Sequence, residues 1–95
     1  MGEPFTEWLD YLKDKAGRAK IRAPLARLRA GNFGDCRSVG SGVWELRIDF
    51  GPGYRVYYEH IERNKVILLL GGGSKSSQKE DVQVAKRRWQ HFQDN

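Results

Sequence analysis

The chain has 95 residues, a length typical of one domain, and we expect residues 1–95 to fold as a single unit. Its 17 lysines and arginines exceed its 12 aspartates and glutamates, which gives a formal net charge of +5. The only cysteine, Cys36, excludes an intramolecular disulfide bond and favours a reducing compartment. No stretch approaches the roughly 18 apolar residues of a membrane span, and the N-terminus does not resemble a signal peptide, so we expect a cytoplasmic protein with no membrane partner.

The positive charge is concentrated between residues 13 and 29, where seven cations accompany a single acidic residue, Asp14. Such a block attracts polyanions and speeds encounter with them. A solvated helix face on a soluble protein would show the same composition. The block is therefore compatible with nucleic-acid binding but does not establish it. The cations best placed for such a role are Lys20, Arg22, Arg27 and Arg29.

Apolar residues at helical spacing predict two helices at the start of the chain. The first covers residues 4–16 and ends at Gly17, and the second covers residues 18–30. Pro24 lies inside the second helix and is expected to kink it or to restart it. The apolar positions that define the two faces are Phe5, Trp8, Leu9, Leu12, Ile21, Leu25 and Leu28.

The composition of residues 32–42 predicts a loop, after which the apolar period changes to two. Alternation over residues 43–50 and 54–61, around a glycine-rich turn at residues 51–53, predicts a β-hairpin. Pairing Phe50 with Tyr54 sets the expected register. Further cross-strand pairs then follow: Ile48 with Val56, Leu46 with Tyr58, Asp49 with Arg55, Arg47 with Tyr57, and Glu45 with Glu59.

After a second polar turn at residues 62–65, residues 66–70 are all apolar, as in a central strand covered on both faces. Residues 71–75 are expected to end this strand, and a third helix is predicted from about Ser77 to Phe92. The predicted fold class is α+β. A helical hairpin packs on a small antiparallel sheet that is followed by a C-terminal helix, in the order ααβββα.

The polar face of the predicted hairpin is the best candidate for chemistry. Arg47, Arg55 and Tyr57 project from one side of it, and Lys75 follows the neighbouring strand. Metal-free cleavage of RNA requires activation of a 2′-hydroxyl, neutralisation of the crowded phosphate and protonation of the leaving oxygen. Arginine suits the phosphate, and tyrosine or lysine can move the protons. We therefore take these four residues as candidate catalytic residues.

Each of these residues also has a purely structural interpretation. Arg55 could pair with Asp49 across the strands, and Arg47 with Glu45. Tyr57 could be an ordinary sheet aromatic, and Lys75 a solvated loop cation. Neither His60 nor His91 has further ligands at suitable spacing, so no metal site and no cofactor are expected.

Two segments resemble the addiction-module killer proteins of the RelE/ParE toxin superfamily, which also contains the HigB/RelE-like toxins. The first is WELRIDFGPGYRVYY at residues 44–58, and the second is LLLGGGSKSSQ at residues 68–78. Weaker similarity at residues 8–9, 28–35 and 81–86 extends the resemblance over almost the whole chain.

The resemblance implies a helical hairpin on an antiparallel sheet, and a prokaryotic toxin neutralised by a cognate antitoxin, commonly a helix-turn-helix protein. It also implies an endoribonuclease that cuts messenger RNA on the ribosome and inhibits translation. Arg47, Arg55, Tyr57 and Lys75 are the positions to which an RNA-facing role carries over. Two other functions stay open: a ParE-like inhibitor of DNA gyrase, and a decayed toxin that only binds its antitoxin.

The chain departs from the family pattern at its start. Relatives usually open with a strand ahead of the first helix, whereas helical periodicity here begins almost directly at Pro4. The expectation is that this strand is missing, which would leave one edge of the sheet open.

Overall fold

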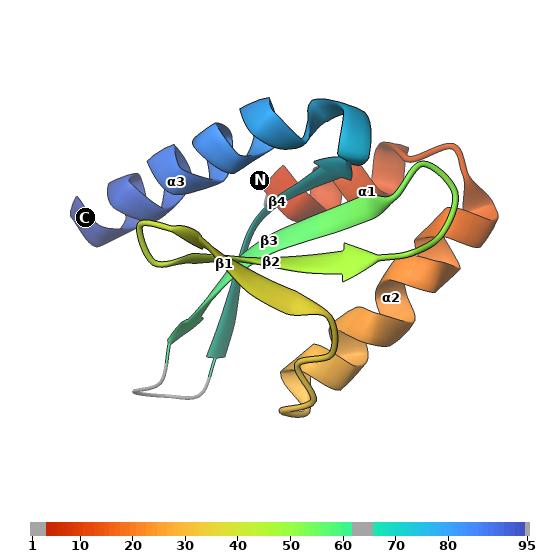
Figure 1. Cartoon of the computed structure of the whole chain (residues 1–95), viewed down its shortest axis with the longest axis horizontal. Coiled ribbons are helices and arrows are strands. Elements are labelled where there is room, and N and C mark those ends of the chain that lie inside the picture. The colour runs from red at the N-terminus through yellow and green to blue at the C-terminus, as the bar shows by residue number, and fades with distance from the viewer. Residues whose placement is uncertain (1–3, 62–65, 95) are drawn as a thin grey trace.

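A computed structural model describes residues 4–61 and 66–94. Two helices, α1 (Pro4–Tyr11) and α2 (Lys15–Arg29), precede the four strands β1 (Cys36–Gly40), β2 (Val43–Ile48), β3 (Tyr54–Ile61) and β4 (Val66–Ser74). A short 3-10 turn (Lys75–Ser77) then leads into α3 (Gln78–Asp94). The strands form one antiparallel sheet in the order β1-β2-β3-β4 (Figure 1). The predicted α+β class is confirmed, and the turn predicted at residues 62–65 lies outside the described residues.

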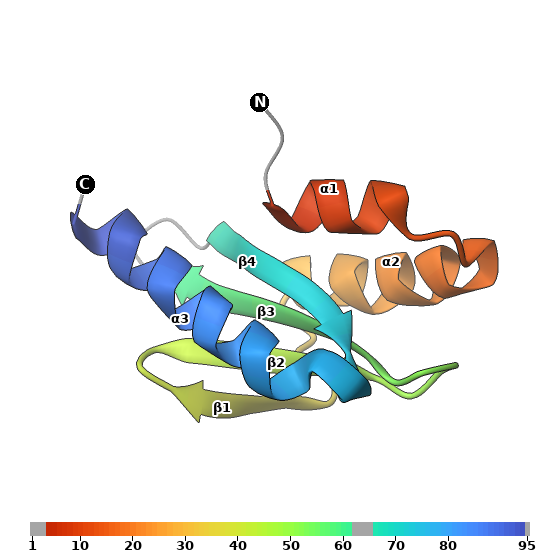
Figure 2. The same ribbon diagram turned by 90° about the horizontal axis from the view of Figure 1, so that it is seen from above.

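The sheet is the middle layer of the molecule. The helical hairpin formed by α1 and α2 covers one face, and α3 covers the other, as the view from above shows (Figure 2). Every helix in the described part of the chain is too short or too polar to span a lipid bilayer. Because each strand is pleated, alternate side chains enter the two layers.

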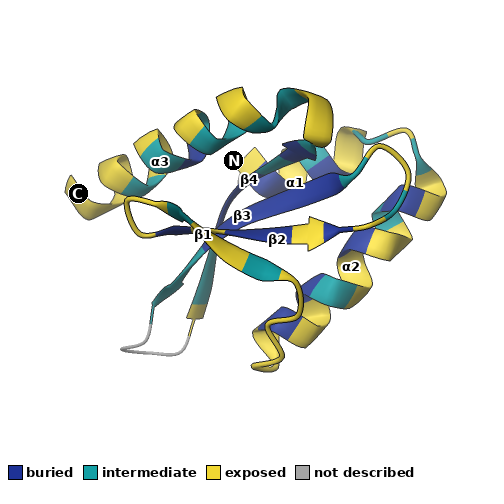
Figure 3. Cartoon of the chain, in the orientation of Figure 1, coloured by how far each residue is buried: buried dark blue, intermediate teal, exposed yellow. Residues whose placement is uncertain are grey.

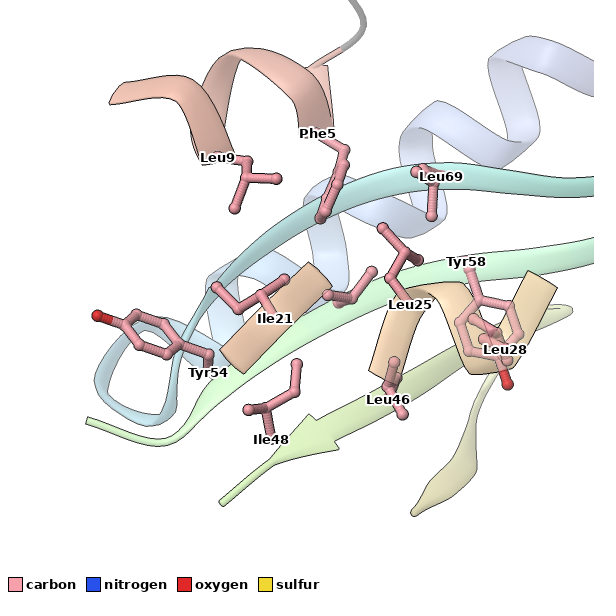
Figure 4. Packing of buried hydrophobic residues seen from close by; sticks show 11 residues of the cluster. Phe5, Leu9, Ile21, Leu25, Leu28, Leu46, Ile48, Tyr54, Tyr58 and Leu69 are labelled. Atoms are coloured by element: carbon pink, nitrogen blue, oxygen red, sulfur yellow. The ribbon is translucent and has the colours of Figure 1, made fainter. Parts of the chain in front are cut away.

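The core beneath the helical hairpin is apolar and continuous (Figure 4). Helical spacing in α2 turns its apolar stripe toward the sheet, where it meets every second residue of β2 and β3. Tyr58 and Leu46 are buried here at the C-terminal end of α2, and Phe5 of α1 packs near Leu69. The remaining buried members of this core are Leu9, Ile21, Leu25, Leu28, Ile48, Tyr54 and Val56.

The core beneath α3 is smaller. Its buried members are Val43, Tyr57, Leu70 and Ala85, with Trp89 packed against them. Figure 3 shows that much of β3 is buried between the two layers, whereas the outer side of α3 is exposed. Phe92, which the periodicity placed on the buried stripe of the last helix, is instead half exposed.

The boundary between the first two helices differs from the prediction. Helix α1 ends at Tyr11 and α2 begins at Lys15, so Gly17 lies in the first turn of α2 and does not separate the helices. The reason is a cap: the carboxylate of Asp14 accepts a hydrogen bond from the Gly17 backbone N–H at 2.9 Å. The Tyr54 hydroxyl donates a second hydrogen bond to Asp14 at 2.8 Å, which ties the start of α2 to the β-hairpin.

Gly17 is required by this close approach, because a Cβ there would lie 2.6 Å from the Asp14 carboxylate and 2.8 Å from the Tyr54 ring. Pro24 was expected to kink or restart the second helix, but α2 is a single helix over residues 15–29 that contains it. The free energy gained when this helix packs on the sheet therefore outweighs the loss of the one backbone hydrogen bond that proline cannot donate.

The sheet contains one strand more than predicted. Residues 36–40, expected to be part of a loop, form the edge strand β1 and pair with β2. Its sequence, CRSVG, carries little apolar alternation because most of it is exposed. Backbone hydrogen bonds to β2 hold this edge strand in the sheet, and it has no continuous apolar face. Apolar periodicity therefore did not detect it.

The predicted hairpin register is wrong by two residues. Ile48 pairs with Tyr54, Leu46 with Val56, and Arg47 with Arg55. The connecting turn is longer than predicted and covers residues 49–53, where Gly51 and Gly53 both have positive φ angles. A slip of two keeps every side chain on its predicted face, which is why alternation could not reveal it.

Strand β4 also differs from the prediction. It continues through Gly71, Gly72 and Gly73 to Ser74, and it lies at the edge of the sheet although both of its faces are covered. A Cβ on Gly72 would lie 2.5 Å from the Trp8 ring, so glycine allows α1 to pack directly on the strand. Within the described residues, α1 is the first element.

Candidate functional site

A buried glutamate organises the polar side of the sheet, beneath the start of α3. The Glu45 side chain is 0% exposed, and its oxygens contact three partners from three different elements. Arg37 Nε of β1 lies 3.0 Å from Oε1, and Gln78 Nε2 of α3 donates to Oε2 at 2.8 Å. Arg55 Nε of β3 lies 3.9 Å from Oε2. A buried carboxylate is tolerated only when it is paired in this way.

Glu45 and the hairpin turn together hold Arg55 in place. The Arg55 side chain is 10% exposed, and its Nη1 donates to the Gly53 carbonyl at 2.7 Å. Its Nε is buried and has no hydrogen-bond partner in the described part of the chain, although the Glu45 carboxylate is near. A guanidinium fixed at one end by a charge and at the other by a backbone carbonyl is preorganised, which is what stabilisation of a developing charge requires.

Arg47, Arg55 and Lys75 lie around the end of the hairpin, and we call them the cation cluster. Arg47 is the cross-strand partner of Arg55. A Cβ on Gly53 would lie 2.9 Å from Arg55 Nη1 and 3.4 Å from Lys75 Cβ, so both side chains flank this glycine. Arg47 and Lys75 are exposed, whereas Arg55 is largely buried. The structure therefore places the backbone positions of three of the four predicted catalytic residues at the same end of the hairpin.

The fourth predicted residue, Tyr57, lies elsewhere. It is fully buried under α3, and its hydroxyl has no hydrogen-bond partner within residues 4–61 and 66–94. Burial, followed by the nearby charge of Glu45, raises the pKa of Tyr57 far above its usual value. Tyr57 therefore stays a neutral phenol that an RNA strand does not reach in this structure, and the sheet-aromatic interpretation describes it correctly.

The expected ion pairs of the hairpin are also replaced by others. Arg55 pairs with Glu45 and not with Asp49, because the register places Arg47 opposite Arg55. Arg47 Nε instead lies 3.2 Å from the Asp35 carboxylate, and both side chains are exposed. Exposed pairs of this kind contribute about 0–1 kcal/mol, so Arg47 is free to exchange Asp35 for another anion.

The predicted RNA-binding residues Lys20, Arg22, Arg27 and Arg29 are all exposed on α2. Lys20 and Arg27 line an open groove of about 580 Å³ between α2 and β2, to which Arg47 also contributes. The Lys20 ammonium lies 5.7 Å from the centre of the Phe50 ring in the same groove. This groove links part of the basic helix to one member of the cation cluster.

Sequence reasoning missed the residues that position Arg55. One of them, Arg37, belongs to a strand that was predicted as a loop. Glu45 lies on the predicted polar face of the hairpin, and Gln78 lies at the start of the last helix. Only the position of α3 over this face reveals that Glu45 is buried. Within residues 4–61 and 66–94, His, Cys, Asp and Glu side chains form no group of three that could hold a metal ion.

Comparison with known proteins identifies the family. The model of the family described as phage-derived protein Gp49-like (DUF891) matches residues 7–90. A Haemophilus influenzae protein described as uncharacterized is 49% identical over 82 residues, which cover 86% of this chain and 82% of that protein. No solved structure shows significant similarity. Such membership is consistent with the toxin of a toxin–antitoxin module, and the chain belongs to the Gp49-like family of phage-derived proteins.

Proposed function

We propose that this protein is the toxin of a toxin–antitoxin module and that it cuts messenger RNA on the ribosome. The observation that carries the proposal is the cation cluster, in which a buried glutamate fixes Arg55 at the end of the hairpin that also carries two exposed cations. Membership of the Gp49-like family and the similarity of residues 44–58 and 68–78 to RelE/ParE toxins support the same function. An antitoxin, most naturally a helix-turn-helix protein encoded beside it, would hold the toxin inactive.

The cluster suits cleavage through the 2′-hydroxyl of RNA. The 2′-oxygen attacks the adjacent phosphorus, the bond from phosphorus to the 5′-oxygen breaks, and a 2′,3′-cyclic phosphate and a 5′-hydroxyl result. Arg55 and Arg47 neutralise the charge that builds up on the phosphate oxygens, because planar guanidinium groups match their geometry. The Lys75 ammonium donates a proton to the departing 5′-oxygen, while the 2′-hydroxyl proton passes to water.

The same site supports the proposal that cleavage depends on the ribosome. The cluster supplies cations on an open surface, and Tyr57, the other candidate for proton transfer, is buried. Positioning of reactants accounts for a large part of many catalysed rates. We therefore propose that the ribosome holds the RNA strand in the bent geometry needed for attack, and that the basic surface of α2 contacts ribosomal RNA.

Purified protein should be incubated with a defined messenger RNA, with and without ribosomes, and in parallel with DNA gyrase and relaxed plasmid. The proposal predicts cuts within translated codons only when ribosomes are present, 2′,3′-cyclic phosphate ends, and unchanged supercoiling. Inhibited supercoiling with intact messenger RNA would instead establish a gyrase inhibitor. If messenger RNA stays intact, supercoiling is unchanged and induction does not affect growth, the chain only binds its antitoxin.

A further inference from the structure

The sheet face that α2 covers is left open beyond the C-terminal end of that helix. Here α2 stops at Arg29, and the chain turns back toward β1 (Figure 1). Two large aromatic side chains are exposed at this end: Phe33 at 41% and Trp44 at 40%. Neither the hydrophobic core nor the cation cluster accounts for them. Large exposed apolar side chains that gather at one place commonly mark a binding site.

These side chains form the wall of a hollow of about 450 Å³. Its lining includes Phe33, Cys36, Trp44, Tyr58, Glu59 and His60. The Phe33 and His60 rings meet edge to face, with their centres 5.6 Å apart. The volume lies in the range of pockets that hold small organic groups. Three aromatic rings on the rim, with few polar groups, suit a flat aromatic ligand that binds by stacking.

The hollow is continuous with the basic surface through Phe33. Phe33 also lines the groove that contains Lys20, Arg27 and Arg47. Together with His60 it further lines a third hollow, which includes Arg29. A ligand with a flat ring in the aromatic hollow would thus find cations on both sides of Phe33.

Two nearby acidic groups already have partners within this chain. Asp35 is already paired with Arg47. Burial raises the pKa of Glu59, and one of its carboxylate oxygens accepts the backbone N–H of His60. Cations beside stacking platforms are the combination that binds single-stranded nucleic acids: the backbone follows the charges and the bases stack on the rings.

We propose that the hollow at Phe33, Trp44 and His60 binds an unpaired base of single-stranded RNA whose backbone follows the groove between α2 and β2. The site is separate from the cation cluster but joined to it through Arg47, so it would set which nucleotide reaches the cut position. The proposal rests on the proposed function only in taking RNA as the substrate. A protein surface such as the antitoxin is the competing occupant, and the test separates the two.

The first arm measures binding of the full chain to a fluorescent single-stranded RNA, without ribosomes, by anisotropy. Phe33→Ala should weaken binding about 5- to 150-fold, as expected for loss of one stacked base. The matched control is Phe92→Ala, which removes a ring that is 50% exposed on α3, at the opposite face of the sheet, and should bind RNA unchanged. Trp44→Phe should retain most of the affinity, because a stacking surface remains.

The second arm separates bases from phosphates. Phe33→Ala should leave the salt dependence of binding unchanged, whereas Arg27→Gln should lower its log–log slope by about 0.7 for each lost phosphate contact. An RNA backbone with abasic residues should bind the wild type and Phe33→Ala equally. Equal binding of normal RNA by the wild type and Phe33→Ala overturns the proposal, and loss of antitoxin binding by that same variant would then assign the hollow to a protein partner. If base-dependent binding holds but no cleavage occurs with ribosomes, the hollow stands and the proposed function fails.

Discussion

The two faces of the sheet come from the same strands but differ in what they bury. Toward α1 and α2, every second residue of β2 and β3 is apolar and packs in one continuous core. Toward α3, the same strands bury Glu45 and most of Arg55 beside a much smaller apolar cluster. The first face supplies burial of apolar surface, the main favourable contribution to folding. The face toward α3 buries less apolar surface, and its buried carboxylate instead fixes the direction of the Arg55 guanidinium.

The difference between the two faces indicates which part of this small domain is available for a functional site. A chain of this size has little apolar surface to spare, so a buried ion pair is a costly feature. Its retention makes sense if the pair holds Arg55 rigid and thereby forms the cation cluster with Arg47 and Lys75. On the proposed function, the apolar core beneath the helical hairpin then serves stability, and the polar network beneath α3 positions Arg55 for cleavage.

The largest effect is expected from Glu45→Ala. Removal of the carboxylate leaves Arg55 largely buried without its counter-charge, which typically costs about 3–5 kcal/mol of the free energy of unfolding. Urea denaturation measures this loss. A double variant, Glu45→Leu with Arg55→Leu, should recover most of the stability but no cleavage, because an apolar pair can replace a buried ion pair. A loss below about 1 kcal/mol for Glu45→Ala would mean that the network does not hold the fold.

Leu28→Ala tests the opposite face. Leu28 is buried beneath α2, and its truncation should lower the free energy of unfolding by about 2–5 kcal/mol. The protein that remains folded should cut RNA at the wild-type rate, since Leu28 lies near the C-terminal end of α2, away from the hairpin turn next to the cation cluster. Val66→Ala, at an exposed position of β4, is the control and should change stability by less than about 0.5 kcal/mol. Loss of cleavage in folded Leu28→Ala would contradict the division between the two faces.

The smallest effect concerns the link between α2 and the hairpin. The hydrogen bond from the Gly17 backbone N–H, followed by the one from the Tyr54 hydroxyl, lowers the pKa of Asp14 below its usual value of about 3.9. Its charged form therefore stabilises the fold above that value, and this contribution is lost as the pH falls through the lowered pKa. Asp14→Asn should melt slightly lower than the wild type at pH 7, and the gap should close below about pH 4. A gap that persists in acid would show that the charge has no part in the cap.

Sequence periodicity predicted the helices, the hairpin and the faces of both its strands, because apolar spacing records which side of an element is buried. It could not detect β1, whose exposed residues carry no apolar pattern, nor a hairpin slip of two residues, which preserves both faces. The glycines at residues 71–73 were interpreted as the end of a strand. The strand in fact continues through them to Ser74, and Gly72 allows Trp8 of α1 to pack on it.

The candidate site was predicted in part. Arg47 and Arg55 lie near each other because residues around one hairpin turn stay close whatever the register, and Lys75 lies near them because β4 pairs with β3 and ends beside Gly53. The burial of Tyr57 could not be predicted, since only the placement of α3 decides which residues of that face are covered. Glu45 was missed because a charged residue in an alternating strand normally faces solvent.

The rate at which Lys75→Ala and Arg47→Ala cut ribosome-bound messenger RNA tests the cation cluster most directly. Both side chains are exposed, so each change should cost no more than about 1 kcal/mol of stability. Loss of a charge contact made in the transition state should slow cleavage about 100- to 1,000-fold. Arg87→Ala, which removes an exposed cation of α3 outside the cluster, should cut at the wild-type rate. Wild-type cleavage by both cluster variants, or equal losses in all three, would show that the RNA is not cut at this site.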